Sequence, residues 1–253
     1  MRTTMISAAG AALLCAIATS VSAAEIKVFS TIAVQSALEG LTPIYEMQSG
    51  DKLTISFATA AALAKRIQGG ETADVLILTP PLLQSLARED KAGHEVTPLV
   101  SSGISVVVKS DAERPDISTP DAFKQAILNA KSIAYSDPAA GGASGVYVAK
   151  MLERLGIADQ VKDKTKHPPA NGNAAVLVAN GDAEIGIQQT PEVMAAPGIT
   201  IVGILPGDLN NVTVFAAGLG VHPANKAAAE AFLKFLKSPR AVDAFRMRGL
   251  DPA

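Results

Sequence analysis

The fold is decided by residues 26–78, IKVFSTIAVQSALEGLTPIYEMQSGDKLTISFATAAALAKRIQGGETADVLIL. Short runs rich in β-branched and apolar residues predict three strands, at 26–29, 53–57 and 74–78. Between them, apolar residues recur at three- and four-residue spacing, which predicts helices over 38–45 and 60–67. Because strands that alternate with helices build a parallel sheet, this stretch predicts an α/β unit.

A second unit of the same kind follows along the chain. Residues 104–109 predict a strand that leaves the first unit, and Thr119 is placed to cap a helix over 120–130. Further strands are predicted at 132–136, 184–189 and 200–205, and further helices at 144–155 and 174–179. The apolar run 212–221 would return the chain to the first unit, where two helices after Pro223 close it.

This order predicts two lobes joined by more than one crossover. The first lobe consists of residues 24–103 and 213–253, and the second consists of residues 104–212. Two such lobes hinge around a cleft. Parallel α/β sheets bind ligands at the carboxyl ends of their strands, so we expect a ligand site in that cleft.

Residues 1–23 have the composition of a secretory signal peptide. Arg2 is the only charged residue before Glu25, and the apolar stretch is shorter than the roughly 20 residues of a membrane-spanning helix. Small residues lead up to Ala23, so we expect cleavage after it and a periplasmic protein. In a lipid-anchored alternative, Cys15 would be the modified residue.

The composition argues against several classes of partner. Cys15 is the single cysteine, so no disulfide framework is available after cleavage. The net charge of -2, with no basic tract, argues against nucleic acid, and the absence of tryptophan argues against a sugar site built on stacking. We expect neither a metal nor a cofactor, because the three histidines lack the spacing of metal ligands. We expect a monomer.

Small hydroxyl residues follow the first two predicted strands. Ser30 and Thr31 come directly after the first strand, and Thr59 comes after the second, before an alanine-rich helix that starts at Ala60. Hydroxyl groups at these positions can bind a ligand or cap the helix that follows, and the sequence leaves both interpretations open. The unobstructed N–H groups at Ala60 favour a ligand that accepts hydrogen bonds.

The longest strand-to-helix junction is SDPAAGGASG, residues 136–145. Gly141 and Gly142 would let a ligand approach the backbone closely. At Ala143 and Ser144 a helix begins, and its first N–H groups carry a partial positive charge that suits oxyanions. This junction is the strongest candidate for binding a small anion.

Two glutamines, Gln188 and Gln189, end the predicted strand 184–189. Neutral amides at a cleft indicate hydrogen bonding to a ligand. Successive strand residues point to opposite faces of the sheet, so one of the two is expected to reach the ligand. The sequence does not show which one.

Recognised catalytic motifs are absent from the sequence, which holds no nucleophile elbow, phosphate-binding loop or zinc-binding HExxH helix. Three residues near the expected cleft could act as a base: Asp137, Tyr147 and Glu184. For Asp137 the sequence favours capping of its own loop over a role as base, and Tyr147 could border the cleft or pack in the core. The catalytic residue, if there is one, stays unknown from the sequence.

Three parts of the sequence resemble the molybdate-binding periplasmic components of ABC importers: VFST at 28–31, SFAT at 56–59 with LAKRI at 63–67, and ADVLI at 73–77. The resemblance spans essentially the whole chain after the signal peptide. It implies the class II periplasmic binding protein fold, capture of a tetrahedral oxyanion, and an ABC permease as partner. The chain departs from the family at Ala33, at the alanines after Thr59 and at Gln189, so the resemblance does not specify molybdate.

Other segments are similar to aconitate isomerase, an enzyme of the same fold: 121–125, 134–137, 143–147, and Gly186 with the two glutamines. Two functions of different class follow. The main hypothesis is a periplasmic solute-binding protein that captures a molybdate-like oxyanion or a carboxylate for an ABC importer. The alternative is an isomerase that interconverts cis- and trans-aconitate in the same cleft. We place the binding protein first because no acid–base pair is visible in the sequence.

Overall fold

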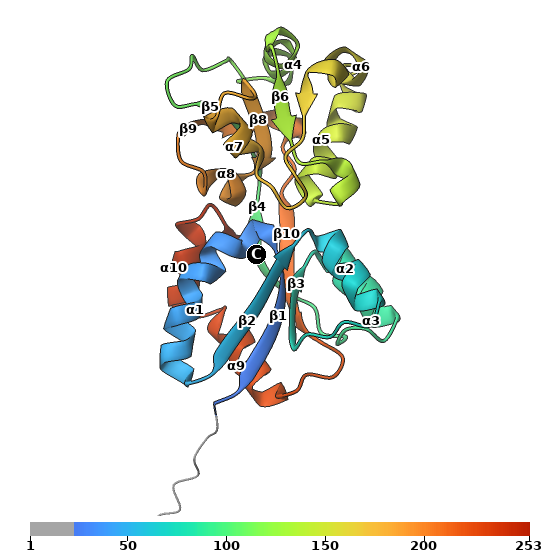
Figure 1. The fold of residues 1–253 in the computed structure, drawn as a ribbon, viewed down its shortest axis with the longest axis vertical. Coiled ribbons are helices and arrows are strands. Elements are labelled where there is room, and N and C mark those ends of the chain that lie inside the picture. The colour runs from blue at the N-terminus through green and yellow to red at the C-terminus, as the bar shows by residue number, and fades with distance from the viewer. Residues whose placement is uncertain (1–22) are drawn as a thin grey trace, which may run out of the picture.

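The computed structural model describes residues 23–253. Residues 1–22, with most of the predicted signal peptide and Cys15, lie outside the described part. The described chain forms two α/β lobes, one above the other in Figure 1. Within residues 23–253, no helix is both long enough and apolar enough to cross a membrane.

The first lobe is built on a sheet of six strands in the order β11-β4-β10-β3-β1-β2. Its strands are β1 (Glu25–Thr31), β2 (Lys52–Ala58), β3 (Val75–Leu78), β4 (Thr97–Ser102), β10 (Thr213–Leu219) and β11 (Asp251–Pro252). Its helices are η1 (Ile32–Val34), α1 (Gln35–Ser49), α2 (Ala60–Gln68), α3 (Pro80–Arg88), α9 (Lys226–Phe235) and α10 (Pro239–Arg246). The elements predicted over 26–78 are therefore present.

The second lobe contains a sheet of five strands in the order β7-β6-β8-β5-β9. Its strands are β5 (Ile104–Lys109), β6 (Ile133–Tyr135), β7 (Thr165–Lys166), β8 (Ile185–Gln189) and β9 (Ile199–Ile204). The main helices are α4 (Pro120–Asn129), α5 (Ala143–Arg154), α6 (Ala158–Val161), α7 (Ala174–Ala179) and α8 (Thr190–Met194). Short 3-10 turns complete it: η2 (Pro138–Ala140), η3 (Lys162–Lys164) and η4 (Gly207–Leu209).

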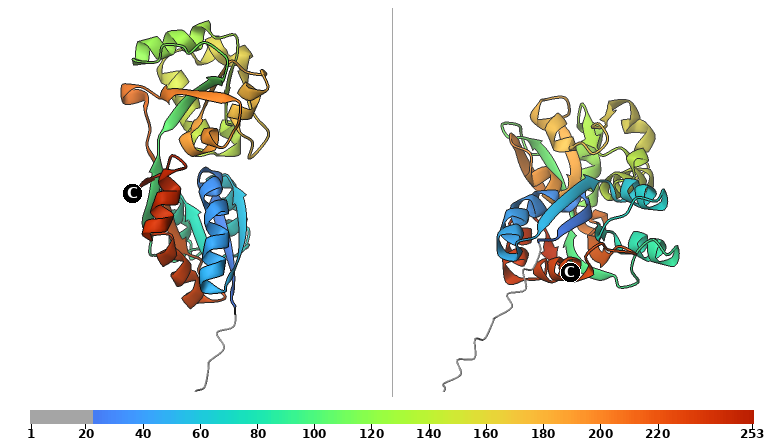
Figure 2. Two further views of the ribbon diagram at one scale, coloured as in Figure 1. Left: turned by 90° about the vertical axis from the view of Figure 1, so that its left-hand side faces the viewer. Right: turned by 60° about the horizontal axis from the view of Figure 1, so that its bottom comes forward.

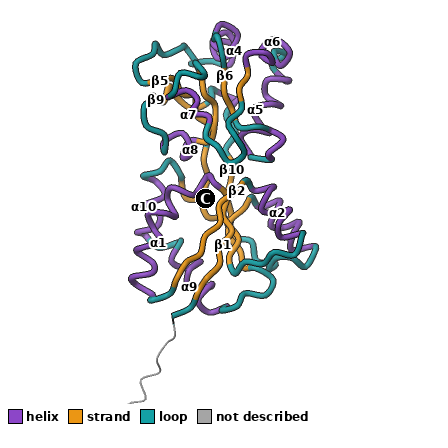
Figure 3. Tube along the Cα trace, in the orientation of Figure 1, coloured by secondary structure: helices purple, strands orange, loops and turns teal. Residues whose placement is uncertain are grey.

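Helices cover both faces of each sheet, with the strands in the middle (Figure 3). Along β1, Val28 packs under α1, α9 and α10, whereas the next residue, Phe29, packs under α2 and α3. The same alternation occurs in β5, where Val106 and Val107 belong to opposite apolar clusters. Successive strand residues point to opposite faces, and both faces are covered by helices, which explains why these strands are almost wholly apolar.

Both sheets are mixed, whereas the sequence predicted mostly parallel sheets. The strands that alternate with helices, such as β1 with β2 and β6 with β8, pair in parallel. Strands β4, β5 and β10 adjoin the crossovers between the lobes and pair antiparallel with their neighbours. The direction of a crossover strand is set by where the chain must go next, which local periodicity does not report.

The two crossovers lie side by side between the lobes (Figures 1 and 2). Ser102 at the end of β4 pairs with Thr213 at the start of β10. The first sheet thus takes strands from both ends of the chain, and the second takes strands from the middle. The lobe limits at 103/104 and 212/213 stay a prediction.

A buried carboxylate holds the returning chain to the first lobe. Asp74 is 6% exposed, and its oxygens accept hydrogen bonds from the backbone N–H groups of Lys27 (2.7 Å) and Ala224 (2.5 Å). It therefore joins the first strand to the segment that follows β10. Asp74 satisfies two backbone donors at once, and backbone donors need partners when they are removed from water.

We expect Asp74→Ala to lower the free energy of unfolding by about 2–3 kcal/mol, because two N–H groups lose their acceptor. The measurement is urea unfolding followed by circular dichroism. Asp182→Ala is the matched control, since Asp182 is exposed, and its effect should stay within about 0.5 kcal/mol. Equal effects of the two substitutions would contradict a clamping role for Asp74.

Candidate functional site

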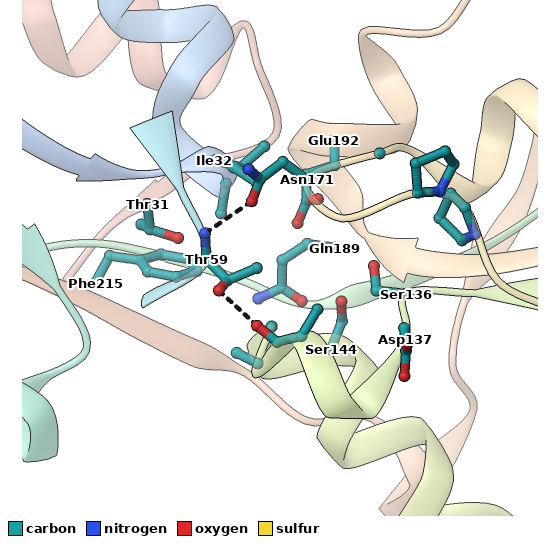
Figure 4. A pocket seen from close by; sticks show the side chains of 17 residues that line it. Thr31, Ile32, Thr59, Ser136, Asp137, Ser144, Asn171, Gln189, Glu192 and Phe215 are labelled. Carbon is teal, nitrogen blue, oxygen red and sulfur yellow. Dashed lines mark hydrogen bonds between the residues drawn. The ribbon is translucent and has the colours of Figure 1, made fainter. Parts of the chain in front are cut away.

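A cavity of about 30 Å³ lies between the two lobes, at the hinge. The first lobe contributes Thr31, the start of η1 and Thr59, and the second contributes the loop from Ser136, the loop 168–172 and the end of β8. Figure 4 shows these side chains around one space. The cavity is therefore built by both lobes together.

The carboxyl ends of strands from both lobes meet at this cavity. Strands β1 and β2 end there in the first lobe, and β6 and β8 end there in the second. Helices α2 and α5 begin at the same place. The first N–H groups of a helix have no partner within the helix and carry a partial positive charge. Helix α5 presents such groups to the cavity, and α2 reaches the cavity through its N-cap, Thr59.

Of the two hydroxyl residues after β1, Thr31 lines the cavity and Ser30 does not. Ser30 is fully buried, and its hydroxyl donates to the carbonyl of Thr31 (3.2 Å). The side chain of Ser30 is thus used inside the first lobe. Thr31 makes no side-chain cap to η1, which leaves its hydroxyl for the cavity.

Thr59 caps α2 and also joins the lobes. Its hydroxyl oxygen accepts from the N–H of Ala62 (3.2 Å) and donates to the carbonyl of Ala140 in the second lobe (2.6 Å). Its own N–H donates to Oδ1 of Asn171, also in the second lobe (3.3 Å). Both interactions between the lobes are drawn in Figure 4. The neighbouring Ala60 is buried and does not line the cavity.

Of the two adjacent glycines in the 136–145 junction, one lines the cavity and the other lies at the contact between the lobes. Gly142, Ala143 and Ser144 line the cavity, whereas Gly141 does not. Gly141 has a φ of +70°, and a Cβ at this position would overlap with the Cβ of Ala61 across the lobe boundary. Gly141 is therefore required for close contact between the lobes.

Asp137 caps its own loop, as one of the two sequence interpretations proposed. Its carboxylate accepts from the N–H of Ala139 (2.8 Å) at the start of η2. In Figure 4 its oxygens point away from Gln189, although the residue contributes to the cavity wall. This capping role and orientation make Asp137 a poor candidate for a base.

The structure distinguishes between the two glutamines. Gln189 lines the cavity, with its Nε2 donating to the carbonyl of Ser102 (3.3 Å). Gln188 points to the other face, where its Oε1 accepts from the N–H of Ala174 (2.6 Å) and its Nε2 donates to Glu192. Gln189 is 1% exposed, and among the described residues its Oε1 has no hydrogen-bond partner.

Two polar lining residues, Asn171 and Glu192, were missed by the sequence analysis, and a third, Ser136, lies in the predicted junction 136–145 but was not named as a site residue. Glu192 lies in the first turn of α8, and burial raises the pKa of its carboxyl to about 7, against the opposing effect of the hydrogen bond from Gln188. Its position after Gln189-Thr190-Pro191 is another strand-to-helix junction, a signal that could have found it. Asn171 lies in an irregular loop, where periodicity offers no signal.

The other candidate bases lie outside the cavity. The hydroxyl of Tyr147 donates to the carbonyl of Leu209 (3.0 Å), and Glu184 accepts from the N–H of Lys131 (2.7 Å). Within the described part of the chain, no cluster of histidine, cysteine, aspartate and glutamate side chains could hold a metal ion.

Two α/β lobes, a pair of crossover strands and a cavity between the lobes define the class of two-lobed binding proteins. The chain belongs to the bacterial extracellular solute-binding proteins, whose family model matches residues 26–251. The resemblance stated from sequence and the predicted fold class are both confirmed.

Relatives of two kinds match nearly the whole chain. An aconitate isomerase from a Pseudomonas species is 34% identical over 232 residues, which covers 89% of this chain and 87% of that protein. The molybdate-binding protein ModA of Escherichia coli K12 is 28% identical over 246 residues, 95% of each chain. The periplasmic molybdate-binding protein of Azotobacter vinelandii shares the fold, with a TM-score of 0.75 at 21% identity, over 90% of this chain and 99% of that one.

We expect Gly141→Ala to favour separation of the lobes, because the added methyl group meets Ala61. Gly156→Ala is the matched control: Gly156 also has a positive φ, of +68°, but a methyl group added there would meet no other atom within 4 Å. Both variants should lose about 1–2 kcal/mol through backbone strain. In small-angle X-ray scattering, the radius of gyration should increase for Gly141→Ala alone. Identical scattering from both variants would contradict the proposed contact.

Proposed function

We propose that this protein is a periplasmic solute-binding protein that captures a small anion between its lobes and delivers it to an ABC permease. One observation carries the proposal: the start of α5 in the second lobe and Thr59, the N-cap of α2 in the first lobe, line one cavity together with hydroxyl groups. Such an arrangement suits an anion because helix N-termini supply donors and positive potential without a charged side chain.

The proposal includes the predicted signal peptide, the predicted lobe limits and the periplasmic location. Residues 1–23 would be removed on export, and the lobes would comprise 24–103 with 213–253, and 104–212. The mature protein would act as a monomer without a metal or cofactor. Membership in a family of extracellular solute-binding proteins supports this location.

The residues proposed to contact the anion are those of the predicted set that line the cavity: Thr31, Thr59, Gly142, Ala143, Ser144 and Gln189. The others act indirectly. Gly141 allows the lobes to meet, Gln188 orders the segment around α7 and α8, and Ser30 and Ala60 are buried behind the wall.

The size of the cavity favours a compact ligand. A buried water needs about 10–15 Å³ of cavity volume, so a cavity of about 30 Å³ accommodates a few waters or a compact oxyanion. A tricarboxylate would require the lobes to lie further apart. The relatives named as molybdate-binding proteins support the compact class of ligand.

Titration calorimetry of the mature protein with molybdate, tungstate, sulfate, phosphate and di- and tricarboxylates tests the proposal. At least one compact oxyanion should bind. Thr59→Val should weaken that binding about two- to tenfold, since it removes one inter-lobe hydrogen bond from the closed form.

The control is Thr119→Val, which removes a similar helix cap, to Ala122, far from the cavity. It should cost about 1 kcal/mol of stability, as any lost cap does, and leave affinity unchanged. The absence of both heat and thermal shift with every anion would exclude the proposed function.

A specific observation supports the isomerase as a second candidate. Glu192 lines the cavity with a pKa near 7, which suits a group that accepts and returns a proton at neutral pH. It would take a proton from the methylene carbon of aconitate, the double bond would move by one carbon, and the proton would return to the far carbon. The 34% identical relative supports this reading.

Incubation with cis- or trans-aconitate, followed by chromatography of the other isomer, separates the two functions. If Glu192 is the base, turnover should rise as the pH rises through about 7, because the ionised form is required, and Glu192→Gln should abolish it. Binding of a compact anion without turnover of aconitate would instead favour the carrier.

A further inference from the structure

The amide of Gln189 has a fixed orientation in the cavity. Its Nε2 donates to the carbonyl of Ser102 (3.3 Å), a residue at the crossover between the lobes. A flipped amide would place Oε1 against that carbonyl, so two acceptors would face each other. The hydrogen bond to Ser102 therefore requires Oε1, and not Nε2, to occupy the unsatisfied side of the amide.

Oε1 of Gln189 is buried and without a partner among the described residues. Buried polar atoms without partners are rare in native proteins, because removing an acceptor from water without compensation costs free energy. Gln189 lines the ligand cavity, so a ligand that carries a hydrogen-bond donor would satisfy this oxygen. A fully deprotonated dianion would place another acceptor beside it.

The donors for the negative part of a ligand lie elsewhere in the cavity. The start of α5 offers the N–H groups of Ala143 and Ser144, and the hydroxyls of Ser136 and Ser144 point toward the same space in Figure 4. The wall is thus divided: the α5 side donates, and Gln189 accepts. Such a division distinguishes between anions that differ in a single proton.

We propose, on the basis of the anion-binding function above, that the preferred ligand is a compact anion with its own O–H group, which donates to Oε1 of Gln189. Its deprotonated oxygens accept from the start of α5. Two sources share this chemistry: a tetrahedral oxyanion that keeps a proton, such as hydrogen phosphate, and a small hydroxy acid. Sulfate, molybdate and simple carboxylates lack the O–H group.

Glu192 adds a dependence on pH. Its carboxyl points into the same space as Gln189 (Figure 4), and below a pKa of about 7 it is neutral and does not repel an anion. The elements packed against α8 are η1, α7, β5, β8 and β9, and Lys109, exposed at the far end of β5, is their one charged residue. Asp137, also on the wall, points away and caps η2. Affinity should therefore fall as the pH rises through 7.

Matched pairs of anions test the inference: phosphate against sulfate, and glycolate against acetate, with molybdate as a further comparison. In titration calorimetry, at least one O–H member should bind about tenfold or more tightly than its partner. Gln189→Met keeps the length of the side chain and removes the acceptor, so the ratio of affinities should fall toward one. Thr59→Val is the control, because it should weaken both members of a pair and preserve their ratio.

A second measurement does not depend on the folding of the Gln189 variant. Between pH 6 and pH 8, the affinity of the native protein for phosphate or glycolate should fall about tenfold more than that of Glu192→Gln. Equal binding within both pairs, or an unchanged ratio in Gln189→Met, would overturn the inference and leave the carrier function standing. If these five anions and the remaining anions of the calorimetry panel above all fail to bind, the carrier function itself fails.

Discussion

The cavity depends on one contact between the lobes, at Thr59. The hydroxyl of this residue caps α2 in the first lobe and donates to Ala140 in the second, while its N–H reaches Asn171. Beside it, the absence of a side chain at Gly141 allows the junction 136–145 to approach Ala61. This contact brings the start of α5, whose first N–H groups have no partner within the helix, close to the first lobe. The same groups line the cavity between the lobes, where electrostatic interactions are stronger than in bulk water.

Hydrogen-bond donors and acceptors lie on different sides of the cavity wall. Helix starts and hydroxyl groups supply donors, whereas Gln189 and Glu192 supply acceptors on the side of β8 and α8. The β8 side of the cavity also contacts the hinge, because Gln189 donates a hydrogen bond to the carbonyl of Ser102 at the crossover. Relatives named for molybdate binding and for aconitate isomerisation share this frame over most of the chain. We infer that the polar groups lining the cavity, rather than the shared fold, determine whether such a protein binds an anion or isomerises aconitate.

Much of the fold could be predicted because its determinants are local. The apolar strands and amphipathic helices of residues 26–78 appear where periodicity places them, and Thr119 caps α4 as its position predicts. The antiparallel crossover strands could not be predicted in this way, because their direction depends on partners more than 100 residues away, as for Ser102 and Thr213. The candidate site, too, could be predicted only in part. Thr31, Thr59 and Ser144 follow strand ends, and the structure brings them together at the hinge.

The sequence by itself determined the two α/β units, their order along the chain and the positions at which helices begin, because these follow from patterns within a few residues. Only the tertiary structure decided which side chains share the cavity. Strand alternation allows either glutamine to face the ligand, and the choice of Gln189 depends on Ser102, 87 residues away in the chain. The pKa of Glu192 likewise results from burial under elements remote in sequence. Desolvation and hydrogen bonding between distant segments leave no periodic pattern in the chain.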